Sequence, residues 1–433
     1  MPGTLVQALR DRDWRRVLSH QLLQNALLLY GVQIGSYIFP LIALPYLTRI
    51  LAPAKFGLIT FAQSFIWYFL TLTEYGFNLT ATRQIAVHRD DPDAVSGVFS
   101  AVMAAKLLLT IAGFVIMLGV VFATPKLRAD WLLYVVSFLS VVGNLLFPVW
   151  FFQGMQRMGH LAVRDFAAKL LSLAAVFALV HRDSDYILAA GIQAGAMVVA
   201  GLAGLLSVRR VAPLRWTSPG WREVYGALRS SWAVFLSMAG LSLTASTNIF
   251  ILGFVATPAE VGYYSAAYRV IVALRMLVSP IVTAIYPHIS HMAASSKQNA
   301  VRFLKRYSLL LALPFFFVSV GLWIGAPLIV DILFGPRFAP TKGILRILAP
   351  QPFLLALSHN FSTYFMLAFG YDKQWSRIIF QIVILNLAIL LLLLWVMPSA
   401  SAVALTGTLL DGYSVAAAYW FYRRHSGSDG SAG

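Results

Sequence analysis

Long apolar runs separated by short charged links dominate the pattern of this chain. A helix needs about 20 apolar residues to cross a hydrocarbon core of about 30 Å, and runs of this length recur along the whole sequence. We therefore predict an all-α polytopic membrane protein with about twelve transmembrane helices. The predicted spans are 24–47, 56–77, 97–122, 131–153, 163–181, 185–207, 229–254, 262–287, 306–330, 344–369, 375–397 and 400–421.

Composition indicates that lipid is the solvent of this chain. Of its 433 residues 59% are hydrophobic and 11% are charged, whereas soluble domains have about 45–50% apolar and about 25% charged residues. The net charge of +17 would suggest nucleic acid in a soluble protein. In a membrane protein the first explanation is the accumulation of Lys and Arg in cytoplasmic loops. Because Cys is absent, disulfides, thiolate metal sites and Cys nucleophiles are excluded.

The distribution of basic residues predicts the sidedness of the spans. With the N-terminus inside, Lys and Arg in the inside links outnumber those in the outside links about three to one. Both termini are then cytoplasmic. The first 20 residues are too polar for a cleaved signal peptide, so we expect a cytoplasmic tail there. The last eight residues, SGSDGSAG, predict a second flexible tail.

A short repeat predicts that the chain has two related halves. Residues 53–57 read PAKFG and residues 258–262 read PAEVG, each after the first span of a half and before an aromatic-rich helix. Six spans in each half give both halves the same orientation, related by an axis along the membrane normal. We predict a six-helix lobe over 1–207, a cytoplasmic linker over 208–228 and a second lobe over 229–433, with a central cavity and alternating access by rocking of the lobes.

Two motifs resemble one family of membrane transporters. LIALPYLTRILAPAKFGLITFAQSF, and then YGFNLTATRQIA at 75–86, resemble the opening of the Wzx-type polysaccharide and O-antigen repeat-unit flippases. These belong to the multidrug/oligosaccharidyl-lipid/polysaccharide exporter superfamily. The resemblance implies transfer of an undecaprenyl-diphosphate-linked oligosaccharide from the cytoplasmic to the periplasmic leaflet of the bacterial inner membrane. It implies a lipid-linked glycan and membrane lipid as partners, with a polysaccharide polymerase and chain-length proteins as further candidates, and no nucleic acid.

Basic residues within the predicted spans are the candidates for binding the diphosphate. The planar guanidinium of arginine donates two hydrogen bonds to a phosphate, and ionisable groups inside spans usually face the bundle interior or a water-filled cavity. Arg269 and Arg275 both lie in the eighth predicted span. At least one of them is a candidate phosphate ligand. The alternative is a structural pair with an acidic residue of another span.

Three further residues are candidate substrate ligands, each with an alternative. Arg83, at the inner end of the second predicted span, could receive phosphate or be an ordinary positive-inside anchor. Asn78, in the same motif, could bind a sugar or cap a helix. Lys106 lies two to three turns into the third predicted span, where it needs a partner or must extend to the interface. By contrast, Asp165 and Lys169 have the spacing of a same-helix ion pair.

Two acids could couple transport to the proton gradient. Asp411 lies near the middle of the last predicted span, and Glu74 lies toward the inner end of the second. Either could bind a proton, and either could instead neutralise an arginine within the membrane.

No enzyme motif accompanies these charges, and no cofactor or metal is predicted. The sequence contains no GxxxxGK[ST], HExxH or GxSxG. His288 and His291 have no third metal ligand nearby in the sequence. A multidrug exporter is disfavoured because it would need an acidic cavity, and a membrane glycosyltransferase or polymerase because the outer links are short. A lipid II flippase remains an alternative that differs mainly in the sugar.

Overall fold

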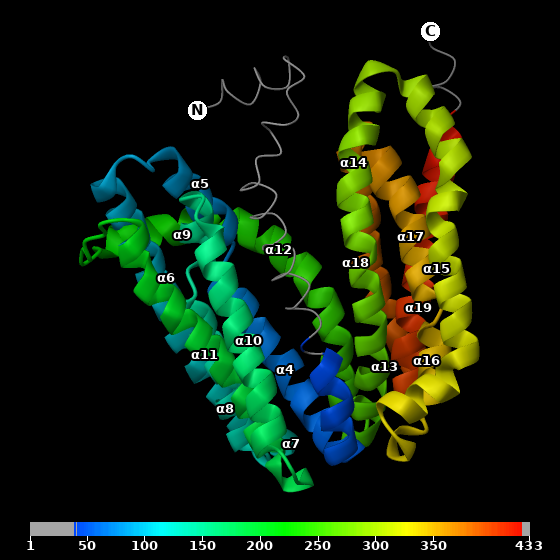
Figure 1. Ribbon diagram of the computed structural model, residues 1–433, viewed down its shortest axis with the longest axis horizontal. Helices are drawn as coiled ribbons and strands as arrows, with labels where there is room; N and C mark the ends of the chain where they lie inside the picture. The colour runs from blue at the N-terminus through cyan, green and yellow to red at the C-terminus, as the bar shows by residue number, and fades with distance from the viewer. Residues whose placement is uncertain (1–38, 40, 427–433) are drawn as a thin grey trace. The chain divides into compact units, whose positions relative to one another are not determined.

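The computed structural model describes residues 39 and 41–426, and every regular element in this part of the chain is helical (Figure 1). The predicted tails, and residues 24–38 and 40 of the predicted first span, lie outside the described residues. Six segments of the described chain are long and apolar enough to cross a membrane. They are Pro53–Val87, Pro92–Ala123, Trp131–Gly154, Asp183–Val211, Lys297–Leu333 and Asp372–Val396. The all-α polytopic fold is therefore confirmed, while the number twelve stays a prediction.

The helices follow one another with short links. After a helix over Leu41–Ile50, the first half contains α4 (Pro53–Glu74), α5 (Phe77–Val87), α6 (Pro92–Ala123), α7 (Pro125–Arg128), α8 (Trp131–Leu146), α9 (Val149–Gly154), α10 (Met158–Leu179), η1 (Asp183–Asp185) and α11 (Tyr186–Val211). The second half contains α12 (Trp221–Val255), α13 (Pro258–Met276), α14 (Val278–Ser295), α15 (Lys297–Leu333), η2 (Pro336–Phe338), α16 (Thr341–Leu348), α17 (Gln351–Phe361), the π-helix η3 (Ser362–Leu367), α18 (Asp372–Val396) and α19 (Ser399–His425).

Several predicted spans are broken into shorter helices. The prediction of one helix over 344–369 is wrong, because α16, α17 and η3 share that range. Pro350 and Pro352 lie at the junction of α16 and α17, and proline has no N–H to donate to the preceding turn. Pro148 separates α8 from α9 in the same way. Two prolines inside α15 leave its 37 residues continuous, so proline alone does not decide where a span breaks.

Local capping determines where helix α13, which begins with the repeat motif of the second half, starts. The Thr257 hydroxyl accepts a hydrogen bond from the Glu260 N–H at 3.3 Å, and the Glu260 carboxylate accepts one from the Thr257 N–H at 3.0 Å. This reciprocal capping box satisfies two amide groups that have no partner within the helix. Pro258 follows at the first helical position, where its missing N–H costs nothing. The start of α13 is therefore fixed by Thr257 together with the motif that follows it.

The described chain divides into two compact units. Unit 1 contains Tyr68–Val180, Ile187–Met238 and the described residues before Leu44; unit 2 contains Leu44–Trp67, His181–Tyr186 and the described residues from Ala239 onward. Helices α4 and α12 each begin in one unit and end in the other. Segments of the first half thus pack within unit 2. The lobe boundaries at 207 and 229 stay a prediction.

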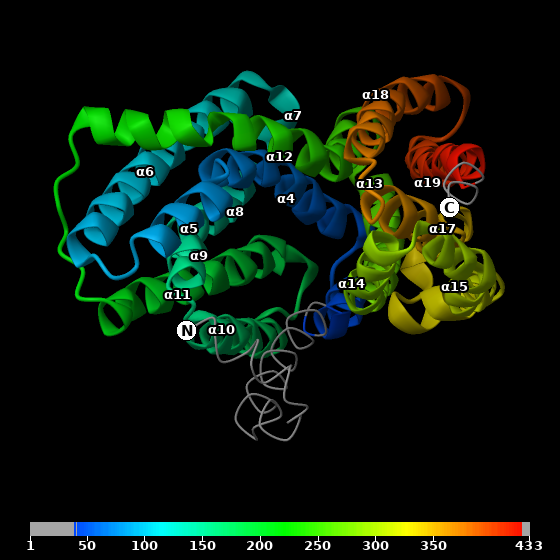
Figure 2. The same cartoon turned by 90° about the horizontal axis from the view of Figure 1, so that it is seen from above.

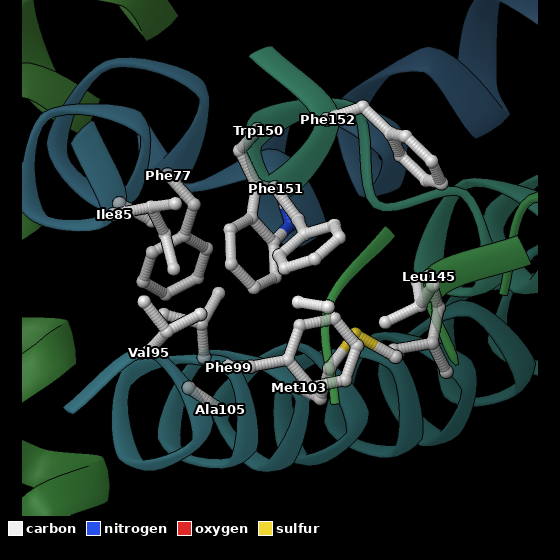
Figure 3. Close-up of a cluster of buried hydrophobic side chains, with 14 of the residues drawn as sticks. Phe77, Ile85, Val95, Phe99, Met103, Ala105, Leu145, Trp150, Phe151 and Phe152 are labelled. Carbon is white, nitrogen blue, oxygen red and sulfur yellow. The ribbon is translucent and has the colours of Figure 1, made fainter. Parts of the chain in front are cut away.

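Each unit has its own apolar core. In unit 1, α5, α6 and α9 meet in an aromatic cluster that includes Phe77, Phe99 and Trp150 (Figure 3). In unit 2, α15, α17, α18 and α19 pack together (Figure 2), and the π-helix contributes Tyr364 and Phe365 to the core. These two cores hold the helices that carry the candidate site residues.

Candidate functional site

The motif at 75–86 forms α5, after a sharp break at the end of α4. Tyr75 and Gly76 have φ angles of 45° and 77°, in the left-handed region that glycine adopts without strain and other residues rarely adopt. A Cβ on Gly76 would lie 2.9 Å from the Val234 side chain of α12. The Tyr75 ring stacks on Phe235 of the same helix at 4.6 Å between centroids. Packing on α12 therefore holds a backbone turn that is unfavourable for a tyrosine.

Helix α5 separates its buried residues from its candidate ligands. Phe77, Ala81 and Ile85 are spaced by four and bury one face in the core of unit 1 (Figure 3). Arg83 lies two residues from both Ala81 and Ile85, a rotation of about 200° around the helix, and its side chain is exposed. Asn78 is half-buried. The helix thus presents Arg83 away from the core, as a phosphate ligand or an interface anchor would require.

In unit 1, Lys106 lies at the centre of a buried polar cluster. Its side chain is 1% exposed. The ammonium donates hydrogen bonds to the Asn144 carbonyl oxygen at 3.2 Å and to the Asn144 side-chain oxygen at 3.1 Å. The Glu74 carboxylate lies 3.6 Å away. Lys106 thus joins α6 to the last turns of α4 and α8, and its charge is paired in place rather than extended to the interface.

One oxygen of this cluster has no partner. Glu74 Oε1 is buried, and no described residue donates a hydrogen bond to it. The adjacent Thr73 hydroxyl is also buried without a partner among the described residues. A buried carboxylate oxygen lacking a donor is costly. Glu74 therefore retains the capacity to accept one more hydrogen bond or a proton.

In unit 2, Arg275 and Asp411 form an ion pair between α13 and α19. The Arg275 guanidinium also donates a hydrogen bond to the Gln351 side-chain oxygen of α17 at 3.0 Å. Gln351 in turn donates to the Thr408 hydroxyl at 3.3 Å. Gly407 leaves space for this amide, since a Cβ there would lie 2.9 Å from its nitrogen. Three helices therefore meet at one guanidinium whose charge is balanced by one carboxylate.

Arg269 has a different environment, although it lies on the same helix α13. Its guanidinium donates a hydrogen bond to the Gln63 side-chain oxygen of α4 at 2.9 Å and lies 5.3 Å from the centre of the Phe56 ring. Both partners are neutral. No carboxylate of the described residues lies within ion-pairing distance of this guanidinium. Arg269 is thus a half-buried cation whose charge is not compensated by the part of the chain that the structure describes.

The two repeat motifs lie directly against each other at the starts of α4 and α13. A Cβ on Gly57 would lie 1.7 Å from the Pro258 carbonyl oxygen, and a Cβ on Gly262 would lie 2.1 Å from the Pro53 carbonyl oxygen. The contact is reciprocal, as a two-fold relation between repeats requires. Only glycine at both positions permits this separation of the two backbones. All four residues belong to unit 2.

Further contacts within unit 2 involve links of the first half. The Arg49 guanidinium donates to the Ile332 carbonyl oxygen at 2.7 Å, and the Ala52 N–H donates to the Asp183 carboxylate at 2.7 Å. In the predicted topology all of these links lie on the outer side of the membrane. The outer ends of the two repeats are therefore bonded to each other within one compact unit.

Sequence reasoning missed the neutral partners. Gln63, Asn144 and Gln351 each hold one of the intramembrane cations. The available signal was an isolated amide side chain within an apolar run. The predicted ion pair of Asp165 and Lys169 is confirmed at 2.6 Å. No cluster of three potential His, Cys, Asp or Glu metal ligands occurs among the described residues.

Comparisons with known proteins agree with this architecture. Residues 22–293 match the family model described as polysaccharide biosynthesis protein. A protein of Escherichia coli K12 that is named as an O-antigen transporter is 32% identical over 367 residues, which cover 85% of this chain and 88% of that protein.

Two solved transporters share the fold. The lipid II flippase MurJ in an inward closed conformation matches with a TM-score of 0.70 at 12% identity, covering 93% of this chain and 90% of MurJ. An inward-facing MATE multidrug transporter of the MOP superfamily matches with a TM-score of 0.61 at 15% identity, covering 93% and 94%. At these identities the likeness shows a shared fold alone.

Proposed function

Because the chain belongs to the polysaccharide biosynthesis protein family, we propose that it is a flippase for undecaprenyl-diphosphate-linked oligosaccharide repeat units. It transfers them from the cytoplasmic to the periplasmic leaflet of the bacterial inner membrane by alternating access, with both of its termini in the cytoplasm. The relative named as an O-antigen transporter and the fold shared with a lipid II flippase support this proposal.

The uncompensated charge of Arg269 carries the proposal. A cation within a membrane helix is unfavourable unless an anion or water accompanies it. Gln63 and Phe56 orient the guanidinium without neutralising it. A diphosphate would supply the missing negative charge, and a guanidinium can bind it through two parallel hydrogen bonds. We therefore assign the principal phosphate contact to Arg269, with Arg83 and Asn78 as the candidates nearer the cytoplasm and Lys106 as a member of a paired cluster.

The ion pair of Arg275 and Asp411 is assigned a different role. Its charges already balance, so a phosphate could bind Arg275 only by displacing Asp411. Protonation of Asp411 would release Arg275, which is the behaviour needed for coupling to a proton gradient. Glu74 is the second candidate proton acceptor, since one of its oxygens has no partner among the described residues. Structural neutralisation of the two cations is the alternative for both acids.

The close backbone contact at Gly57 and Gly262, called the glycine crossing below, is consistent with alternating access. Gly57 and Gly262 lie at helix starts that the topology predicts to be periplasmic. A contact that joins the two repeats there would close the periplasmic side while the cytoplasmic side receives substrate. Release would require these backbones to separate.

Reconstitution tests the proposed function. Purified protein in liposomes should translocate a fluorescent polyprenyl-diphosphate oligosaccharide, measured as label that becomes accessible to a membrane-impermeant quencher. Arg269→Gln should slow translocation about 10- to 100-fold, as expected for the loss of hydrogen bonds to a charged group. Arg269→Lys should retain part of the rate because it keeps the charge.

The control is Arg302→Gln, which removes a positive charge from an exposed position on α15. It should translocate at the wild-type rate. An unchanged rate for Arg269→Gln would remove Arg269 from the binding site. Transport of lipid II in preference to the oligosaccharide, or of a cationic drug, would overturn the substrate assignment.

A further inference from the structure

A groove of about 630 Å³ lies between the start of α18 and the end of α19. Gln374, Arg377 and Gln381 line it from α18, with the spacing of one helix face. Tyr413, Trp420 and Arg424 line it from the facing side of α19. The two helices lie side by side (Figure 2). The groove belongs entirely to unit 2 and contains none of the residues assigned to the flippase site.

The groove has a rigid polar end. The Tyr413 hydroxyl donates a hydrogen bond to the Gln381 side-chain oxygen at 2.9 Å. This bond joins α18 to α19 one turn beyond Arg377. A cross-helix hydrogen bond therefore holds α18 and α19 together at this end of the groove.

The groove is positively charged. Arg377 and Arg424 are both exposed, and no carboxylate lines the groove. Neither guanidinium forms an ion pair with a carboxylate of the described residues. The Arg424 guanidinium lies 5.5 Å from the centre of the Trp420 ring, which is 62% exposed. Two arginines and an exposed tryptophan are the groups that contact lipid head groups at a membrane interface.

An apolar surface continues from the groove along α18. Ile384 and Leu391 follow Arg377 at intervals of seven residues on the same side of the helix, and both are exposed. Only 11% of the apolar window of this span is buried. The helix has 25 residues, enough to cross the hydrocarbon core. Its start, where the arginines lie, is predicted to be cytoplasmic, so the polar end lies at the depth of lipid phosphates.

We propose that this groove binds the head group of an anionic phospholipid of the cytoplasmic leaflet. Arg377 and Arg424 bind the phosphate from the two helices. Gln374 donates a further hydrogen bond, Trp420 covers the glycerol region, and an acyl chain lies along Ile384 and Leu391. The charge balance favours a head group with net negative charge over a zwitterionic one, since two fixed cations face it and no carboxylate lines the groove.

Lipid retention tests this site. The purified full-length protein is placed in nanodiscs that contain equal amounts of phosphatidylglycerol and phosphatidylcholine, and the lipids that remain bound after transfer to detergent are measured by native mass spectrometry. The wild type should retain phosphatidylglycerol preferentially. The double variant Arg377→Gln/Arg424→Gln should lose this preference by about 30-fold, the factor expected for two basic residues that face an anionic lipid.

A matched double variant, Arg302→Gln/Arg306→Gln, removes two exposed arginines of α15 and should retain the wild-type preference. An equal loss in both double variants would attribute the effect to general surface charge and overturn the site. Retention of phosphatidylglycerol by the groove variant would also overturn it. Equal thermal stabilisation of the wild type by inorganic phosphate and by phosphatidylglycerol would show an anion site that is not a lipid site.

A second measurement does not depend on the charge variants folding. Brominated phosphatidylglycerol should quench the fluorescence of Trp420 more than brominated phosphatidylcholine does. Trp420→Phe should abolish that difference while the remaining tryptophans report an intact protein. Equal quenching by the two lipids in the wild type would contradict the proposal.

Discussion

Unit 1 and unit 2 each hold an ion pair between helices, but the two pairs differ in burial and geometry. Lys106 is 1% exposed and bonds to Asn144, while Glu74, 3.6 Å away, is 25% exposed. Arg275 and Asp411 are 26% and 21% exposed, contact each other directly and share Gln351. A sealed cation is costly to leave without its partner, whereas a cation that is partly exposed can exchange its partner for water or a phosphate. We therefore expect the first pair to matter mainly for stability and the second mainly for transport.

The largest expected effect follows from removing the sealed lysine. Lys106→Ala should lower the free energy of unfolding by about 3–5 kcal/mol, because it leaves Glu74 without its cation and Asn144 without a donor. Unfolding in detergent micelles, followed by circular dichroism, measures the change. The double variant Lys106→Met/Glu74→Gln should recover much of the loss, since no buried charge remains. A single variant as stable as the wild type would show that this pair is not structural.

The glycine crossing should be the next most sensitive feature, and it bears on the second pair because α13 carries both Gly262 and Arg275. Gly262→Ala should destabilise the protein by about 1–3 kcal/mol, as overpacking does, since its Cβ would overlap the Pro53 carbonyl. Gly119→Ala is the control, because a Cβ at Gly119 meets nothing within 4 Å. The same micelle unfolding assay compares them. Equal stability of both variants would contradict the close crossing.

The partly exposed pair should matter more for transport than for stability. Asp411→Asn should cost only about 1 kcal/mol, because water can solvate part of Arg275. It should also abolish the acceleration of oligosaccharide translocation by a proton gradient in proteoliposomes. Glu74→Gln should keep that acceleration, since the cation that protonation of Glu74 would release, Lys106, is sealed from water and substrate. If instead Glu74→Gln alone removed the proton dependence, the roles of the two acids would be reversed.

The smallest effect is expected at the half-buried pair of Asp165 and Lys169. These residues lie four apart on α10 with a contact of 2.6 Å. Lys169→Ala should change the free energy of unfolding by no more than about 0.5 kcal/mol, as is typical of ion pairs four residues apart on one helix. The assay used for Lys106→Ala measures it. A loss comparable to that of Lys106→Ala would mean that burial does not distinguish the two lysines.

The sequence predicted the helices better than their partners. Apolar runs predicted α6 and α18 because a long hydrophobic helix is the simplest solution to crossing lipid. The separate helix α5 that follows Tyr75 and Gly76, and the break at Pro350, were missed, since they depend on what the neighbouring helices accommodate. The motif repeat predicted that Gly57 and Gly262 are equivalent. It could not predict that they touch, because a symmetry relation does not fix the distance of a residue from the axis.

At the candidate site, too, the sequence identified unusual residues but not their partners. Charged residues in apolar spans identified Arg269, Arg275 and Asp411 as exceptional. Which of them pair could not be deduced, since Arg275 and Asp411 are 136 positions apart. Gln63 and Gln351 were overlooked because an amide is a less costly residue in a membrane helix than a charge. Their importance lies in the hydrogen bonds that they accept from Arg269 and Arg275.

Helices α4 and α12 each run without interruption from one compact unit into the other. A continuous helix resists bending, so the chain passes from one unit to the other near Trp67 and near Met238 through helical segments and not through slack loops. At these two places the boundary between the units is therefore set by side-chain packing and not by a break in the backbone.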